Sequence, residues 1–121
     1  MSRVVDAARS MVGVRFRLHG RDPATGLDCV GLVALATGCA APTGYPLRGG
    51  EPGRIAAMLD AVMGRGTLAP GAVLLTRTGP GQLHLGVWTG SGLIHADVGL
   101  RRVVERPGAV AWPVLGIWRG E

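Results

Sequence analysis

Three side chains in this sequence have the chemistry of a nucleophile and its base. Cys29 follows Asp28 at the start of a long apolar run, and His84 and His95 lie in two later apolar segments. A cysteine attacks as its thiolate, which the unpaired N–H groups and positive dipole end of a helix N-terminus favour. An imidazole within hydrogen-bond reach can take the thiol proton, and the same N–H groups can hold a developing oxyanion. These residues therefore indicate a cysteine hydrolase.

Two other interpretations of the cysteines need to be weighed against this one. A free cysteine is most often a small buried hydrophobic residue. A disulfide to Cys39 is disfavoured, because ten positions along one helix separate the two thiols too far, so both are expected to be free. Zinc ligation by Cys29, Cys39, His84 and His95 lacks the paired short spacings of structural zinc sites. We therefore expect no metal and no cofactor.

The nucleophile requires a helix that begins at residue 29. Asp28 is a good N-cap, and Gly38 is a natural C-terminal stop after the run from Cys29 to Thr37. The run is apolar on every side, which predicts a central, buried helix. A buried strand is the alternative, since Val and Leu suit both, but the Asp cap, the two alanines and the following glycine favour the helix.

The two histidines are expected to lie on neighbouring strands, 83–88 and 93–96, joined by a turn at 89–92. A two-residue loop places His95 directly opposite His84, and a four-residue loop places it opposite Gly86. In both registers the imidazoles share one face, and only a three-residue loop would separate them. His84 would then be the base and His95 the group that orients it, with Asp97 as the alternative orienting residue.

The remaining pattern predicts an α+β domain that spans residues 1–121. Helices come first and a five-stranded, mainly antiparallel sheet follows. Besides the helix that begins at residue 29, we expect one helix over 3–12, stopped by Gly13, and another from 51–52 to 63. Residues 13–27 and 40–53 are expected to be irregular. The remaining strands are expected at 71–76, 100–105 and 114–119.

The charge and apolar patterns limit the partners. The net charge is +5, but the arginines are scattered and no aromatic residues alternate with them to stack bases, so no nucleic-acid partner is expected. Asp6 and Arg9 interrupt the N-terminus, which is not a secretory signal, and no apolar run approaches the roughly 20 residues of a membrane span. The sequence thus predicts no membrane partner and a protein that is cytoplasmic as synthesised. His19 is interpreted as a solvated loop residue or part of a substrate rim.

Four motifs together resemble one family. They occur in the family's order and with similar spacing, within residues 3–105: Asp28-Cys29-Val30-Gly31-Leu32-Val33, Ala69-Pro70-Gly71-Ala72-Val73-Leu74, His84-Leu85-Gly86-Val87-Trp88 and Leu93-Ile94-His95-Ala96. This set is similar to the NlpC/P-sixty peptidases, which are papain-like cell-wall hydrolases. The resemblance implies a papain-like core with the nucleophile helix packed on the sheet.

The resemblance also implies an activity and a role for each residue. The reaction would be hydrolysis of an amide bond in peptidoglycan stem peptides, typically between D-glutamate and a diamino acid. Cys29 would be the nucleophile, His84 the base and His95 its orienting partner. Asp28 corresponds to an acidic residue that often reads a free substrate amine.

Two departures from the family concern the substrate. Val30 replaces the usual Ser or Thr after the nucleophile, and Phe16 replaces a Tyr in the segment before it. Asp28, Phe16 and Val30 are the candidate substrate-binding residues. The shortness of the chain is similar to family members encoded with phage tails or gene-transfer particles, whose proteins are then possible partners that carry the domain to the cell wall. The alternatives are an inactive binding module of the same fold and a thiol amidase or acyltransferase with a non-wall substrate.

Overall fold

The computed structural model describes residues 2–40 and 51–121. Its N-terminal helix α1 spans Arg3–Ser10, capped by the Ser2 hydroxyl, which accepts from the Val5 N–H. Helix α3 spans Pro52–Asp60 and begins with proline in its first turn, where the missing N–H costs nothing. Both helices end two to three residues before the predicted ends, in single turns. Most of the loop predicted at 40–53 lies outside the described residues.

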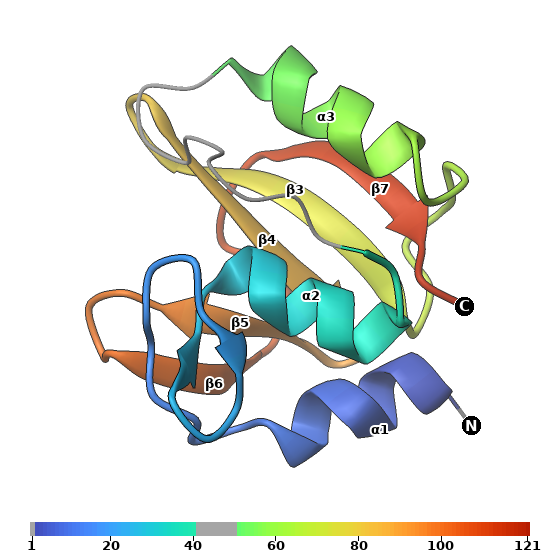
Figure 1. Ribbon diagram of the computed structural model, residues 1–121. Coiled ribbons are helices and arrows are strands. Elements are labelled where there is room, and N and C mark those ends of the chain that lie inside the picture. The colour runs from blue at the N-terminus through green and yellow to red at the C-terminus, as the bar shows by residue number, and fades with distance from the viewer. Residues whose placement is uncertain (1, 41–50) are drawn as a thin grey trace.

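Helix α2 spans Cys29–Thr37 and has the predicted ends. The Asp28 carboxylate accepts from the Gly31 N–H, and Gly38 adopts a left-handed conformation with φ of 75°. Glycine takes this conformation without a steric penalty, so it closes the helix. Most of the helix is buried as predicted, although Leu35 is 43% exposed. The central position of α2 is visible in Figure 1.

Five antiparallel strands form the main sheet, as the sequence predicts. They are β3 (Ala72–Gly79), β4 (Gln82–Trp88), β5 (Gly92–Asp97), β6 (Arg102–Pro107) and β7 (Val114–Arg119). Their order across the sheet is β6-β5-β4-β3-β7. The last strand has the predicted bounds, and the other four lie within one to three residues of them.

The segment predicted to be irregular, 13–27, contains a small sheet. Strands β1 (Arg21–Asp22) and β2 (Gly26–Leu27) pair antiparallel. Each strand has only two residues, too few to show an alternation of apolar and polar side chains, which is why the sequence does not reveal them. This hairpin leads directly into the start of α2, so it sets the position of the nucleophile.

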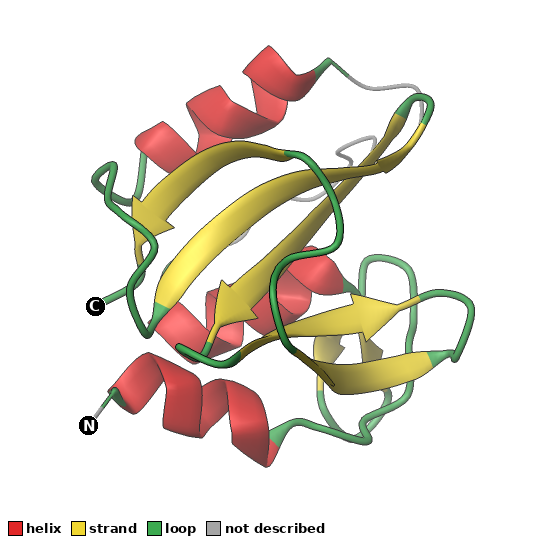
Figure 2. Cartoon of the chain, turned by 180° about the vertical axis from the view of Figure 1, so that it is seen from behind, coloured by secondary structure: helices red, strands yellow, loops and turns green. Residues whose placement is uncertain are grey.

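The two faces of the main sheet are covered differently. The larger apolar cluster joins α1, α2 and α3 to one face, through residues such as Leu32, Leu85 and Ile94. A smaller cluster of Ala72, Leu74, Trp88 and Leu93 lies on the other face. Figure 2 shows the connection from β6 to β7 crossing that second face. Within the described residues, no helix has the length and apolar character needed to cross a membrane.

Candidate active site

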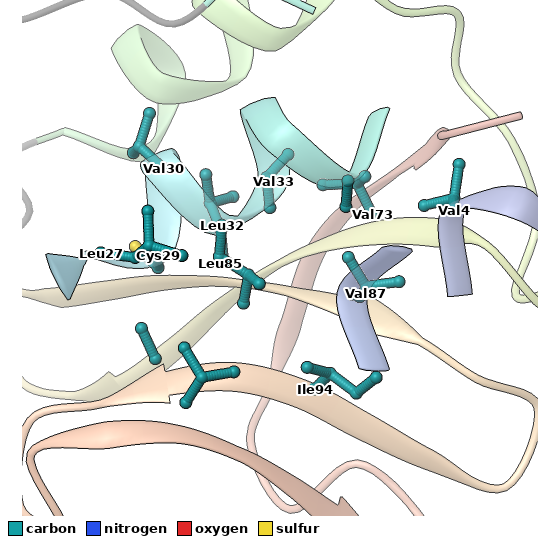
Figure 3. Packing of buried hydrophobic residues seen from close by; sticks show 14 of the residues in the cluster. Val4, Leu27, Cys29, Val30, Leu32, Val33, Val73, Leu85, Val87 and Ile94 are labelled. Carbon is teal, nitrogen blue, oxygen red and sulfur yellow. The ribbon is translucent and has the colours of Figure 1, made fainter. Parts of the chain in front are cut away.

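Cys29 is the first residue of α2 and is almost fully buried, with 1% of its surface exposed. Figure 3 shows its sulfur beside Leu27 and above β4, with Leu85 close by. The backbone N–H groups of Leu85, Cys29 and Val30 all interact with the sulfur and favour its thiolate form. The predicted helix start therefore directs backbone donors at the nucleophile.

These donors do not produce the low-pKa thiolate that the sequence predicts. Burial, together with the smaller effect of the neighbouring Asp28 carboxylate, raises the pKa of the Cys29 thiol to about 12 despite these donors. Removing a thiolate from water costs more than a few partial charges at a helix end can return. Cys29 is therefore a neutral thiol at rest, although the helix N-terminus favours the thiolate as the sequence predicts.

Strands β4 and β5 form a fork beside the nucleophile. They pair only at Val87–Ile94 and Trp88–Leu93, next to their connecting turn, and then diverge (Figures 1 and 2). This register corresponds to a four-residue loop at 89–92. It is one of the two predicted registers in which His84 and His95 share a face of the sheet. The Leu85 N–H that interacts with the Cys29 sulfur lies in the part of β4 that no longer pairs with β5.

His84 and His95 meet across the fork. Their rings are nearly perpendicular, and His84 Nε2 lies 2.8 Å from His95 Nδ1. This hydrogen bond uses Nε2 of His84 and does not involve its Nδ1. Asp97, the alternative orienting residue, accepts instead from the Leu100 N–H. Among the described residues, no hydrogen bond joins the Cys29 sulfur to either imidazole.

Both imidazoles are neutral at pH 7. Burial, together with the smaller effect of the adjacent His95, lowers the pKa of His84 to about 4, although Asp97 and Asp28 oppose the shift. Burial also lowers the pKa of His95. A neutral His84 can accept a proton, as a general base must. Cys29 and His84 are therefore both neutral at rest and do not form an ion pair.

The backbone of His84 is fixed by its neighbours. The buried Thr76 hydroxyl on β3 donates to the His84 carbonyl at 3.1 Å. Two residues on, a Cβ at Gly86 would lie 2.8 Å from the Leu93 side chain and 3.0 Å from the Ile94 carbonyl oxygen. Only glycine lets β5 approach this closely before the strands diverge. These contacts keep the base at the open part of the fork.

Asp28 is fully buried and its carboxylate is already engaged. Oδ1 accepts from the Gly31 N–H at 2.9 Å and from Arg21 Nη1 at 3.0 Å, and Oδ2 accepts from the His19 N–H at 2.9 Å. The guanidinium of Arg21 thus lies where a substrate amine would have to bind. The capping role of Asp28 is confirmed. To bind a substrate amine, Asp28 would have to release the Arg21 guanidinium and pair with the amine instead.

Phe16 lies beside the segment that leads into α2, and Val30 is the second residue of that helix. The backbone of Phe16 forms an isolated β-bridge with Leu27, on the strand that leads into α2. The Phe16 ring is half-buried against the larger apolar cluster. Val30 lines a cavity of about 390 Å³ between α2 and α3, whose other walls include Val33, Met58 and Leu85. The cavity is almost wholly apolar, so the valine extends an apolar surface to the position next to Cys29.

Sequence reasoning missed two residues of this region. Arg21 pairs with Asp28 from a two-residue strand that carries no sequence pattern. Trp112 belongs to none of the sequence motifs, yet its ring packs edge-to-face against both His84 and His95. Cys39, a free thiol like Cys29, lies past the end of α2 and contacts the Val62 carbonyl.

Residues 2–40 and 51–121 contain no group of three or more His, Cys, Asp or Glu placed to hold a metal.

Comparison with known proteins places this arrangement in a known fold. No family model and no curated protein sequence matches the chain. Solved structures do match: NlpC1 from Trichomonas vaginalis, with a TM-score of 0.72 and 21% identity over 98% of this chain, is similar throughout. The chain has the NlpC/P-sixty fold. The NlpC/P-sixty domain of the peptidoglycan hydrolase SagA is similar too, with a TM-score of 0.56 and 24% identity over 87% of this chain and 86% of that domain.

The NlpC/P-sixty domains that match are often parts of longer proteins. This chain spans 43% of the Trichomonas protein. It spans 62% of the peptidoglycan hydrolase RipB from Mycobacterium tuberculosis, with a TM-score of 0.52 and 20% identity over 97% of this chain. The likeness confirms the papain-like α+β core that the motifs predict. Because the identities are low, it establishes the fold, and the chemistry has to be argued from the residues.

Proposed function

We propose that the protein is a cysteine peptidase that hydrolyses an amide bond in peptidoglycan stem peptides. The observation that carries this proposal is the 2.8 Å contact between His84 Nε2 and His95 Nδ1 beside a cysteine at a helix N-terminus. A pair of neutral imidazoles, one orienting the other, is what a general base for a thiol requires. Solved structures of the same fold include peptidoglycan hydrolases, which supports the substrate class.

The reaction would begin from neutral groups. As the Cys29 sulfur attacks the substrate carbonyl carbon, the thiol proton passes to His84 Nδ1, while His95 holds the ring through Nε2. Backbone N–H groups at the start of α2 would stabilise the oxyanion of the tetrahedral intermediate. Collapse breaks the C–N bond, and the leaving amine takes the proton from His84. Water then hydrolyses the thioester, with His84 again as base, and restores the thiol.

Peptidoglycan digestion tests the substrate. Purified sacculi are incubated with the protein and with Cys29→Ala, and the soluble fragments are identified by mass spectrometry. We expect the protein to release stem-peptide fragments that end at D-glutamate, and we expect none from Cys29→Ala. Fragments cut elsewhere would overturn the D-glutamyl specificity, and equal, negligible release by both proteins would overturn the assignment to peptidoglycan.

The cavity beside Val30 favours one second candidate, a thiol amidase or acyltransferase with an apolar substrate. An aliphatic group bound between α2 and α3 would lie next to the nucleophile, since Val30 and Leu85 both line the cavity and flank the sulfur. Hydrolysis of p-nitrophenyl esters of increasing acyl length would test it. A kcat/KM that rises with chain length supports this candidate, and one that is independent of length contradicts it.

Delivery to the wall by a phage tail or gene-transfer particle is the remaining part of the proposal. It is supported only by the sequence resemblance. Co-purification of the tagged protein with particle proteins from a producing culture would test it, and recovery of the protein free of particles would contradict it.

A further inference from the structure

The rings of His84 and His95 have a third aromatic neighbour that the proposed reaction does not use. Trp112 lies on the connection between β6 and β7, which crosses the sheet face opposite α2 (Figure 2). It is half-buried and packs against the smaller apolar cluster that includes Trp88 and Leu93. The indole therefore reaches the histidines from the side away from the cluster around Cys29.

The three rings form a perpendicular corner. The Trp112 ring centroid lies 6.0 Å from that of His84, with an interplanar angle of 89°, and 5.2 Å from that of His95, also at 89°. Edge-to-face packing at these distances is a preferred aromatic geometry, worth about 0.5–1.5 kcal/mol per pair beyond area burial. A rotation of either imidazole would give up one of these contacts.

Trp112 is also held from another direction. The Arg106 guanidinium on β6 lies 5.6 Å from the Trp112 ring centroid, within the range of a cation–π contact. The apolar cluster, Arg106 and the two imidazoles together fix the indole on a segment that otherwise has no regular secondary structure. A loop residue held this firmly can transmit its orientation to the groups it touches.

We propose that Trp112 is a positioning residue for the His84–His95 pair, which it orients and shields from water on the face opposite α2. The indole fixes the planes of both imidazole rings. The hydrogen bond between His84 Nε2 and His95 Nδ1 is thereby kept, and His84 Nδ1 stays directed away from the indole. This inference deepens the proposed function, but its main test does not depend on that function.

Shielding has an electrostatic consequence that can be measured. Burial is the largest cause of the lowered pKa of both histidines. The charged groups that also act on them are Asp97 and Asp28 for His84, and Asp97 and Arg106 for His95. Replacing Trp112 removes none of these charges, although Arg106 loses its contact with the indole. Water admitted by removal of the indole would therefore raise both pKa values towards that of a free imidazole.

Proton NMR titration of the imidazole signals tests this directly, because the protein has three histidines. The third, His19, lies outside the pair. Trp112→Ala is expected to raise the titration midpoints of His84 and His95 by about one pH unit or more, and Trp112→Phe by clearly less. Trp88→Phe is the matched control, since Trp88 lies in the same apolar cluster, and it should leave both midpoints within roughly 0.3 unit.

Two results would overturn the inference. One is a Trp112→Ala protein in which both midpoints stay within roughly 0.3 unit of the original; the other is an equal shift in Trp88→Phe. If Trp112→Ala does not fold, Trp112→Leu, which keeps an apolar side chain without a ring, takes its place under the same criteria.

Activity on peptidoglycan provides a second readout. Trp112→Ala is expected to lower kcat by about tenfold, with KM within about twofold, because the indole lies behind the base and not in the substrate path. Trp112→Phe should restore most of the rate. Shifted titrations in a protein that never cleaves peptidoglycan would reject the proposed function and leave this inference standing. Unshifted midpoints in a Trp112→Ala protein, together with cleavage of peptidoglycan by the original protein, would reject this inference and leave the proposed function standing.

Discussion

Replacing Asp28 with alanine separates a structural carboxylate from a substrate-reading one. The side chain is fully buried and accepts from the N–H groups of Gly31 and His19 and from Arg21. Loss of the helix cap costs about 1 kcal/mol, and loss of a second N–H bond to a charged acceptor costs about 1.5 kcal/mol. The ion pair adds about 1 kcal/mol, because Arg21 is 27% exposed and can turn towards water. The total is roughly 3.5 kcal/mol.

Urea unfolding followed by circular dichroism measures this loss. With a slope of about 1.5 kcal/mol per molar urea, the midpoint should fall by roughly 2 M. Asp22→Ala is the control, because Asp22 is exposed and its side chain accepts from the Ala24 N–H in the same hairpin; its midpoint should fall by less than about 0.5 M. If Asp28→Ala unfolded like the original protein but showed a raised KM, the carboxylate would be a substrate reader and our interpretation of the buried pair would be wrong.

Four further outcomes follow from the site. Cys29→Ala should abolish hydrolysis while retaining the circular dichroism spectrum, whereas Cys39→Ser should retain activity. Iodoacetamide at pH 7.5 should label Cys39 before Cys29, as peptide mass mapping would show, because Cys29 is buried and its pKa is raised to about 12; the reverse order would contradict a neutral resting thiol. The free energy of unfolding should decline as the pH falls from about 6.5 towards about 4, because the unfolded chain takes up a proton on His84 before the folded protein does. Gly31→Ala should prevent folding, as judged by circular dichroism, because its Cβ would lie 2.1 Å from the Gly20 carbonyl oxygen.

The elements that the sequence predicts correctly are those whose signals are local. Asp28 and Gly38 define the ends of α2 through capping interactions that need no tertiary structure. The alternation around His84 and His95 fixes their common face once the turn is a four-residue loop. The β1–β2 hairpin was missed because its strands are held by pairing alone and are too short to show a pattern.

What the sequence cannot supply are contacts between distant segments. The bond between His84 and His95 was expected from register, but the fork that lets their rings meet arises where β5 leaves β4. Arg21 and Trp112 reach the site from irregular segments, and nothing in their neighbours marks them as partners of Asp28 and of the histidines. Only the folded backbone brings these side chains together.

The ionisation state of Cys29 shows why position on a helix is not enough to infer reactivity. A helix N-terminus stabilises a thiolate through the partial charges of its N–H groups, and this effect is largest where water is absent. The same absence of water penalises the whole unit charge, and burial wins, so the pKa of Cys29 rises to about 12. In the proposed reaction, activation then comes from His84, whose lowered pKa keeps it neutral and able to accept the proton. In the proposed reaction both Cys29 and His84 are uncharged before attack, which would make the orientation of His84 by His95 and Trp112 the decisive feature of the site.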